Sequence, residues 1–218
     1  MGIPAIAPYP MPTAADLPKN QVDWRPDPER AVLFFHDMQA YFLAPYDPGS
    51  ALYGELLANT RALRDRAAAL GMPVVYSAQP GDMDRGQRGL LYDFWGPGMS
   101  AHERDTGIVE PLRPADGDTV LTKWRYSAFV RSELRDLIQK SGRDQLIVCG
   151  VYAHVGCLMT AVDAFSSDIQ PFLVADALAD FSADHHRSAL DYAARCCAAI
   201  HTTEQTLDFL AAEKTSAR

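Results

Sequence analysis

Three side chains that can do chemistry follow three separate apolar runs in the sequence: Asp37, Lys123 and Cys157. Each run has the length and composition of a buried strand, and the carboxyl ends of parallel strands lie along one edge of a sheet. A carboxyl group, an ammonium group and a thiol at one edge suit acid–base or nucleophilic catalysis. A single aspartate after a strand is more often a turn or capping residue, so the prediction depends on all three occurring together.

The clearest strand-to-helix unit lies between residues 145 and 165. Residues 146–149 form an apolar run rich in β-branched side chains, which is typical of a strand buried on both faces of a parallel sheet. Apolar residues recur with helical spacing over 157–165. The intervening turn, GVYAHVG, leads Cys157 onto a helix N-terminus, where we expect a lowered thiol pKa. The simpler alternative is a tight turn that buries a structural cysteine.

The rest of the chain alternates in the same way between apolar runs and helical periodicity. The other predicted strands are 31–35, 74–77, 119–122, 171–174 and a short one around Ile200, and the other predicted helices are 51–70, 130–141, 182–199 and 203–213. This alternation predicts an α/β fold with three layers, α/β/α, around a central, mostly parallel, doubly wound sheet. We expect a single domain over residues 1–218, with an extended N-terminal arm at 1–30 and a long functional loop at 80–117.

Composition and charge argue against several classes of partner. The formal net charge is -8, and no basic cluster offsets it, so we expect no nucleic-acid partner. No apolar run approaches the roughly 20 residues that span a bilayer, so we expect no membrane partner. The four cysteines form no CxxC pair, and three of them lie in strand or helix patterns. This favours reduced thiols in a cytoplasmic protein.

Six short motifs, in order along the chain, resemble the isochorismatase family. They are HDMQ at 36–39, AQP at 78–80, DFWGPGM at 93–99, TKWRYSAF at 122–129, GVYAHVGC at 150–157 and VADALADFS at 174–182. The resemblance covers nearly the whole chain and is closest to members of phenazine and enterobactin biosynthesis. It implies an isochorismatase-like fold of the cysteine-hydrolase superfamily. It also implies a hydrolase of secondary-metabolite biosynthesis that releases pyruvate from isochorismate or 2-amino-2-deoxyisochorismate.

The implied reaction is hydrolysis of a vinyl ether, whose slow step is protonation of the terminal methylene carbon. This step needs a carboxylic acid that is still protonated near neutral pH. The resemblance implies Asp37 as that acid, and apolar neighbours such as Phe34, Phe35 and Phe42 would favour its neutral form. Lys123 would oppose this. Our hypothesis is that a substrate carboxylate draws Lys123 into a new ion pair, so that Asp37 takes up a proton on binding.

The resemblance also implies a pocket for an isochorismate-like dianion. Its substrate-binding residues would be Phe42, Gln79, Arg88, Trp95, Tyr126, Tyr152 and Gly156. In this set the arginine can hold a carboxylate in a bidentate contact, whereas the glutamine and the tyrosines can bond to a carboxylate or a ring hydroxyl. The tryptophan and the phenylalanine offer apolar walls. We expect no cofactor and no metal, and the family implies a homodimer.

Two other functions stay open from the sequence. Related amidohydrolases use an Asp–Lys–Cys triad in which the thiolate attacks a carbonyl, and Asp37, Lys123 and Cys157 would match that triad. The second alternative is a non-catalytic binding or scaffold protein that uses the same surface. Retention of the acid, the lysine and the pocket aromatics argues against this second alternative.

The remaining candidates are predicted to be structural. His185 and His186 are neighbours on a helix and therefore point apart, so we expect a surface pair and not a metal site. His154 fits a core or interface position as well as a catalytic one. Asp176 and Asp180 have the positions of strand-end and capping residues.

Overall fold

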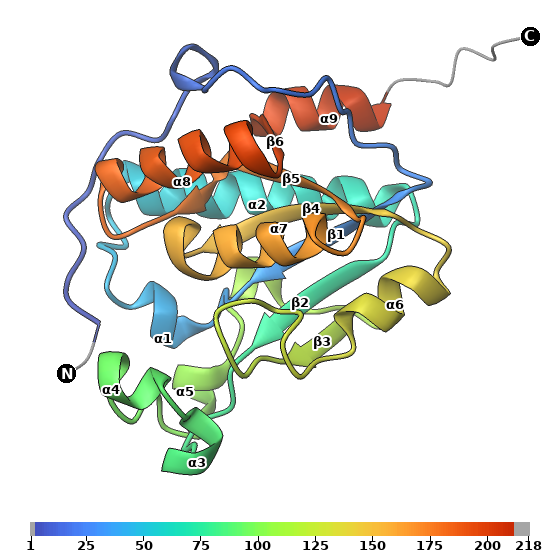
Figure 1. Cartoon of the computed structure of the whole chain (residues 1–218). Coiled ribbons are helices and arrows are strands. Elements are labelled where there is room, and N and C mark those ends of the chain that lie inside the picture. Colours follow the sequence, from blue (N-terminus) through green and yellow to red (C-terminus); the bar gives the residue numbers. More distant parts are fainter. Residues whose placement is uncertain (1–2, 212–218) are drawn as a thin grey trace, which may run out of the picture.

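The computed structural model describes residues 3–211, which form three layers, with helices on both sides of one sheet (Figure 1). The strands are β1 (Ala31–His36), β2 (Val74–Ala78), β3 (Thr119–Thr122), β4 (Gln145–Val151), β5 (Gln170–Ala179) and β6 (Ala199–His201). They pair in the order β3-β2-β1-β4-β5-β6, and every pairing is parallel. The predicted α/β class and doubly wound sheet are confirmed.

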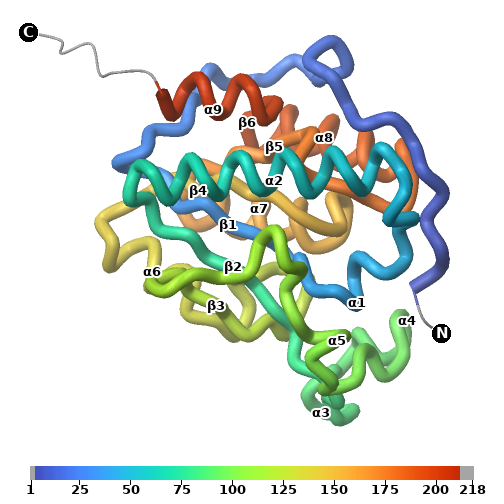
Figure 2. Tube along the Cα trace, turned by 180° about the vertical axis from the view of Figure 1, so that it is seen from behind, coloured from blue at the N-terminus to red at the C-terminus, as the bar shows by residue number. Residues whose placement is uncertain are grey.

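Two apolar cores lie on opposite faces of this sheet. Helices α2 (Ala51–Ala69) and α9 (Thr203–Ala211) cover one face, which is turned toward the viewer in Figure 2. Helices α6 (Leu134–Lys140), α7 (Leu158–Phe165) and α8 (Ala183–Cys196) cover the other face. Within β1, Leu33 and Phe35 belong to the first core, and Val32 and Phe34 to the second. This period of two explains why β1 is apolar along most of its length, since both of its faces are buried.

β5 is longer than the sequence predicted. The apolar run at 171–174 indicated a short strand, but pairing with β4 continues as far as Ala179 after an irregularity in register. The residues added at the carboxyl end are mostly alanines and mostly buried, so they lack the alternation that marks a strand. The extension brings Asp180 and Phe181 to the carboxyl edge of the sheet.

Two helices are shorter than predicted. α6 begins at Leu134 and not at 130, because the preceding residues form a turn in which the Ser132 hydroxyl donates to the Ala128 carbonyl. α8 ends at Cys196 and not at 199, since the chain there turns into β6. α9 is described as far as Ala211, and residues 212–213 of the predicted helix lie outside the described residues.

The segment between β2 and β3 contains short helices as well as loops. They are α3 (Arg85–Arg88), α4 (Leu91–Trp95), α5 (Glu103–Thr106) and a 3-10 turn at Glu110–Leu112. The helices α3, α4 and α5 gather with α1 (Ala40–Leu43) beyond the carboxyl edge of the sheet (Figure 1), whereas the 3-10 turn packs against α2. Helices of four or five residues are too short to show a period in the sequence, so the segment resembled a loop.

The N-terminal arm is held to the sheet by buried polar contacts. The Tyr9 hydroxyl accepts from the Asp180 N–H at 2.8 Å and donates to His186 Nδ1 at 3.1 Å. His186 Nε2 in turn donates to the Ala175 carbonyl at 3.0 Å. His186 is 1% exposed, and burial lowers its pKa to about 4. The predicted surface pair is therefore wrong for His186, although its neighbour His185 is exposed.

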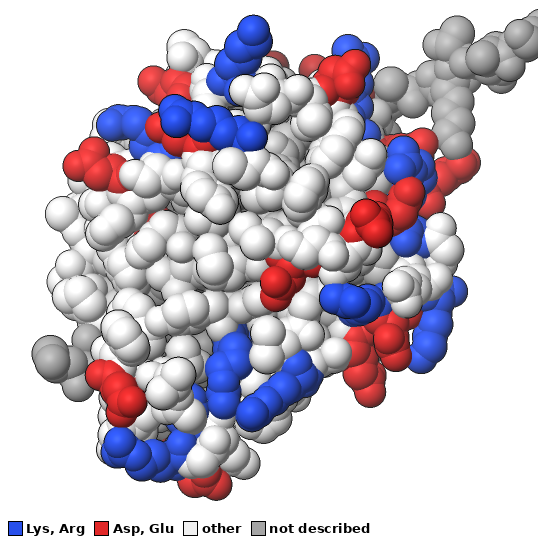
Figure 3. Space-filling view, viewed as in Figure 1, with Lys and Arg blue, Asp and Glu red and all other residues white. Residues whose placement is uncertain are grey.

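Figure 3 shows how charge is distributed over one face of the molecule. Lys and Arg side chains lie there among Asp and Glu side chains around a largely uncharged centre. Within residues 3–211, no helix is both long enough and apolar enough to span a bilayer.

Acid should destabilise this fold through His186. Its pKa is about 4 in the folded protein against an ordinary value of 6.5, so the unfolded chain binds a proton first as pH falls. The contribution of His186 is complete above pH 6.5 and is lost between 6.5 and about 4, by up to about 3 kcal/mol. Glutamine at position 186 can still donate to Ala175 and accept from Tyr9, but it does not titrate. We therefore expect His186→Gln to flatten the plot of unfolding free energy against pH between 6.5 and about 4.

Urea unfolding at several pH values between about 7 and 4 measures this effect. His185→Gln, the same change at the exposed neighbouring position, is the matched control and should leave the curve as it is. An equal loss of stability in the wild type and in His186→Gln would show that His186 is not the group responsible.

Candidate active site

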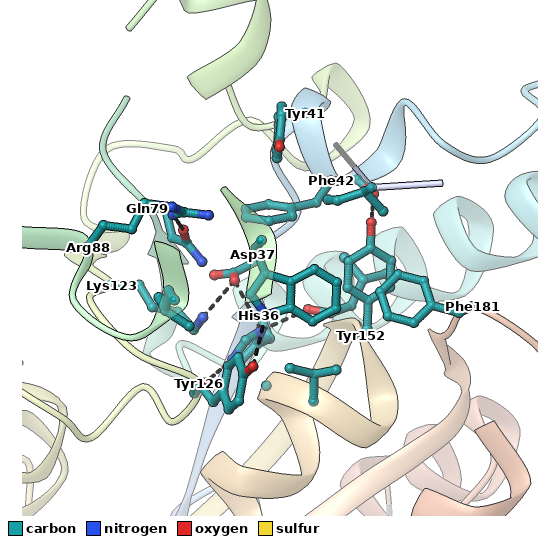
Figure 4. A pocket seen from close by; sticks show the side chains of 16 residues that line it. His36, Asp37, Tyr41, Phe42, Gln79, Arg88, Lys123, Tyr126, Tyr152 and Phe181 are labelled. Atoms are coloured by element: carbon teal, nitrogen blue, oxygen red, sulfur yellow. Dashed lines mark hydrogen bonds and ion pairs between the residues drawn. The ribbon is translucent and has the colours of Figure 1, made fainter. Parts of the chain in front are cut away.

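A pocket lies at the carboxyl ends of β1 and β4, where the strand order reverses. In open α/β sheets this switch point is where ligands bind. The structure brings nine of the ten predicted site residues to its walls: Asp37, Phe42, Gln79, Arg88, Trp95, Lys123, Tyr126, Tyr152 and Gly156 (Figure 4). The start of the described chain also reaches it, since Ile3 is part of the wall. Cys157 is the predicted residue that does not line the pocket.

Asp37 and Lys123 form a buried ion pair in the pocket wall. Lys123 Nζ lies 2.8 Å from Asp37 Oδ2, and the two side chains are 3% and 5% exposed. The second carboxylate oxygen, Oδ1, accepts from the Ser77 hydroxyl at 2.6 Å. Asp37 also has a φ of +50°, a left-handed conformation that side chains rarely adopt unless the surroundings enforce it. The end of β1 is therefore held in a fixed and costly geometry at this site.

Arg88 is a second buried cation, and it has no anionic partner. It is 4% exposed, and its guanidinium donates to the Gly96 carbonyl and, at 3.3 Å, to Gln79 Oε1. None of the acidic side chains in the described part of the chain pairs with it, and burial lowers its pKa. A buried charge without a counter-charge is unfavourable. The pocket thus holds two cations and one carboxylate, an excess of positive charge that suits an anionic ligand.

Gln79 is positioned by Gln39, a residue to which the sequence analysis gave no role. Gln39 is fully buried, and its amide accepts from the Gln79 N–H at 2.7 Å and donates to the Gln79 carbonyl at 2.9 Å. This pair of bonds resembles one rung of a sheet and fixes the backbone after β2. The signal was present in the sequence, because Gln39 is the last residue of the HDMQ motif.

The two pocket tyrosines differ in what their hydroxyl groups can do. The Tyr126 hydroxyl accepts from Trp95 Nε1 at 2.8 Å, so its own hydrogen is free for a ligand. The Tyr152 hydroxyl donates to the Phe42 carbonyl at 2.6 Å, and burial raises its pKa. Tyr152 therefore offers its ring to the pocket. Phe181, which sequence reasoning missed, packs on that ring at 4.3 Å between centroids and extends the aromatic wall.

His36 was also missed, and it explains why position 156 is a glycine. Its ring nitrogens Nδ1 and Nε2 lie 2.8 Å from the Val151 carbonyl and 3.2 Å from the Tyr126 carbonyl. Burial lowers its pKa to about 4, so at neutral pH it is uncharged and one nitrogen donates. A Cβ at Gly156 would lie 2.0 Å from His36 Cε1. His36 thus lies between the end of β4 and the loop that follows β3, and donates to one of these two carbonyls.

The predicted activation of Cys157 is wrong. Cys157 is the last residue of a π-helical turn at Ala153–Cys157. Its side chain is fully buried and packs in the core under α6, α7 and α8. Burial raises its pKa well above the usual value, and the charge of Asp37 raises it further. These effects outweigh the helix N-terminus, so the resting side chain is a neutral thiol.

A second cluster lies beside Phe181 and does not line the pocket. Asp180 accepts from the backbone N–H groups of His154 and Phe181, at 2.6 and 2.8 Å, and from His154 Nδ1 at 2.7 Å. The ring of His185 stacks on His154 with a centroid distance of 4.4 Å. Although these groups come within 4.8 Å of one another, as metal ligands would, both carboxylate oxygens already serve as hydrogen-bond acceptors. Asp180 is thus a capping residue, as predicted, and Asp176 caps α9 through Thr203.

We expect Gly156→Ala to destabilise the fold by about 1–3 kcal/mol and to remove most activity, because its methyl group would overlap the ring of His36. Gly54→Ala is the matched control: nothing lies within 4 Å of a Cβ at this position of α2, so the change should stabilise by about 0.5–1 kcal/mol. Thermal unfolding and turnover of both variants measure this. A Gly156→Ala protein with native stability would mean that His36 can move aside.

Comparison with solved structures defines the class of protein. The cysteine hydrolase from Pseudomonas syringae pv. phaseolicola superposes with a TM-score of 0.78 at 23% identity, over 88% of this chain and 96% of that one. The N-carbamoylsarcosine amidase from Thermoplasma acidophilum gives 0.70 at 24% identity, over 80% and 97%. The fold is that of the isochorismatase-like and cysteine hydrolases.

Sequence comparison narrows this class to a family. The isochorismatase domain model matches residues 31–205. The phenazine biosynthesis protein PhzD of Pseudomonas fluorescens is 57% identical over 94% of this chain and 99% of its own length. The isochorismatase of Bacillus subtilis is 53% identical, over 96% and 67%, and enterobactin synthase component B of Escherichia coli is 47% identical, over 95% and 73%. This chain belongs to the isochorismatase family and is a hydrolase.

Proposed function

We propose that this protein hydrolyses the vinyl ether of isochorismate or of 2-amino-2-deoxyisochorismate and releases pyruvate, in secondary-metabolite biosynthesis. Relatives named isochorismatase, phenazine biosynthesis protein and enterobactin synthase component support this assignment. The observation that carries it is the charge of the pocket. Arg88 is buried there without an anionic partner, and Lys123 lies on the same wall. Two cations around one cavity suit a substrate with two carboxylates.

In this proposal the pocket binds the substrate before any bond changes. Arg88 holds one carboxylate with its guanidinium, a fork that matches the planar anion. Lys123 turns from Asp37 to the other carboxylate. The rings of Phe42, Trp95 and Tyr152 enclose the substrate ring and exclude water from the acid.

The chemical step is a proton transfer to carbon. The carboxyl group of Asp37 gives its proton to the terminal methylene carbon, and the π electrons of the double bond form the new C–H bond. The resulting oxocarbenium ion is stabilised by the carboxylate that remains on Asp37. Water then adds to the cation and gives a proton back to the Asp37 carboxylate. The hemiketal separates into pyruvate and a dihydro-dihydroxybenzoate, or a dihydro-hydroxyanthranilate from the amino substrate. No nucleophilic side chain takes part, so Cys157 has no step to perform.

Exchange of single residues separates this mechanism from amide hydrolysis through a thiolate. We expect Asp37→Asn, which has the same shape but no acidic proton, to lower pyruvate release by at least about 10²-fold. Cys157→Ala should leave pyruvate release largely intact, because the buried thiol does not line the pocket. Coupled NADH oxidation measures the pyruvate. An inactive Cys157→Ala protein would favour the amidohydrolase alternative, in which the thiolate is the nucleophile.

Binding of the dianion should be linked to uptake of a proton. With Asp37 ionised, two cations face three negative charges, whereas a protonated Asp37 leaves the complex balanced. We therefore expect an inert dianionic substrate analogue to bind with uptake of one proton per site. Calorimetry in buffers of different ionisation enthalpy measures this number, and Asp37→Asn is the control that should take up none. A value of zero for the wild type would contradict the exchange of partners by Lys123.

The same proposal includes the oligomeric state, the location and the absence of a cofactor. We expect a homodimer, as the family implies, which light scattering of the purified protein checks. We expect the protein to act in the cytoplasm as a single domain, without cofactor or metal. Both substrates, with a hydroxyl or an amino group at carbon two of the ring, are compatible with the proposal. The pocket charges would bind the carboxylates, which the two substrates share.

A further inference from the structure

Ser77 contacts the proposed acid from outside the pocket. It is the fourth residue of β2, pairs in register with His36 of β1, and is 1% exposed. The Asp37 N–H donates to Ser77 Oγ at 3.2 Å, and the Ser77 hydroxyl donates to Asp37 Oδ1 at 2.6 Å. Ser77 is not among the residues that line the pocket. Any influence on the substrate must therefore pass through Asp37.

The two hydrogen bonds settle where the hydrogen of Ser77 points. A hydroxyl group has one hydrogen and two acceptor positions. Ser77 Oγ uses one acceptor position for the N–H of Asp37, and within the described residues the acceptor that its single hydrogen reaches is Oδ1. If the carboxyl proton were placed on Oδ1, it would compete with this hydrogen for the same short contact. One of the two would be left without an acceptor in a buried site, which is unfavourable.

The other oxygen, Oδ2, has a different neighbour. It lies 2.8 Å from Lys123 Nζ, and Lys123 does line the pocket. When the ammonium moves to a substrate carboxylate, Oδ2 loses its donor and becomes the oxygen that can accept a proton. Oδ1 keeps its bond to Ser77 throughout.

From this geometry we propose that Ser77 is a positioning residue that directs the transferable proton of the acid to Oδ2, the oxygen on the pocket side. The inference rests on the proposed role of Asp37 as general acid. During the transfer the Oδ2–H bond breaks, the C–H bond of the new methyl group forms, and the carboxylate that remains keeps the Ser77 hydroxyl as a donor to Oδ1. Ser77 thus both orients the acid and stabilises its conjugate base.

Loss of the hydroxyl should have a specific kinetic signature. For Ser77→Ala we expect kcat to fall about tenfold to a hundredfold, the range for a hydrogen bond to a charged group, with KM within about twofold. The alkaline limb of the pH–rate profile should move to higher pH, because the ionised acid has lost a donor. Ser77→Thr keeps a hydroxyl and should restore the wild-type limb. Ser77→Cys, with a weak S–H donor and little change in volume, should lie between wild type and alanine.

The matched control is Thr206→Val, which removes another fully buried hydroxyl. In α9 this hydroxyl donates to the carbonyl of Thr202, the residue before the helix. It should lower thermal stability without moving kcat or the pH profile. If Ser77→Ala does not fold, the comparison of Ser77→Cys with Ser77→Thr carries the test.

Two results would overturn the inference in distinguishable ways. Ser77 variants with the wild-type kcat and pH limb, alongside an inactive Asp37→Asn protein, would show that the acid needs no help from Ser77. An active Asp37→Asn protein would instead remove the proposed function, and the inference with it.

Discussion

The contact between Lys123 and Asp37 is the interaction on which this site depends. Asp37 follows β1 and Lys123 follows β3, so the pair spans β2, which lies between them in the sheet and contributes Ser77. Two charges out of water are tolerated because each serves as the other's counter-ion and because further donors complete the carboxylate. The same ion pair is suited to catalysis in the proposed mechanism, since a carboxylate of the ligand can replace Asp37 as the partner of Lys123.

Around this pair, the neighbouring residues fix geometry and do not react. His36 is neutral and lies between the end of β4 and the loop that follows β3, and Gln39 fixes the backbone of Gln79. Arg88 is a buried cation with no acidic side chain paired to it in the described part of the chain. A pocket built in this way is selective for charge and shape before any proton moves. In a preorganised active site, fixed groups of this kind are already in place when the reaction begins.

The sequence was sufficient for the parts of the molecule that obey a period or a motif. Strands such as β1 and β4, buried on both faces, appear as continuous apolar runs, and the order of the motifs placed nine site residues around one pocket. Sequence reasoning failed where contacts between residues far apart in the chain determine burial or a pKa. The thiol pKa of Cys157 depends on burial, which no local pattern reports, and His186 is buried because Tyr9, 177 residues away, gives it a partner. The short helices α3 to α5 were missed because four or five residues carry no period.

The path of the N-terminal arm has a practical consequence for anyone who handles this protein. The described chain begins at Ile3 in the wall of the pocket, and Tyr9 then anchors the arm beside Asp180, whereas Ala211 lies at the opposite end of the molecule (Figure 1). Purification tags or fluorescent fusions attached ahead of Ile3 would start beside the pocket wall. Attachment beyond Ala211 starts at the other end of the molecule, so this is the end to choose for immobilisation or for joining this enzyme to another.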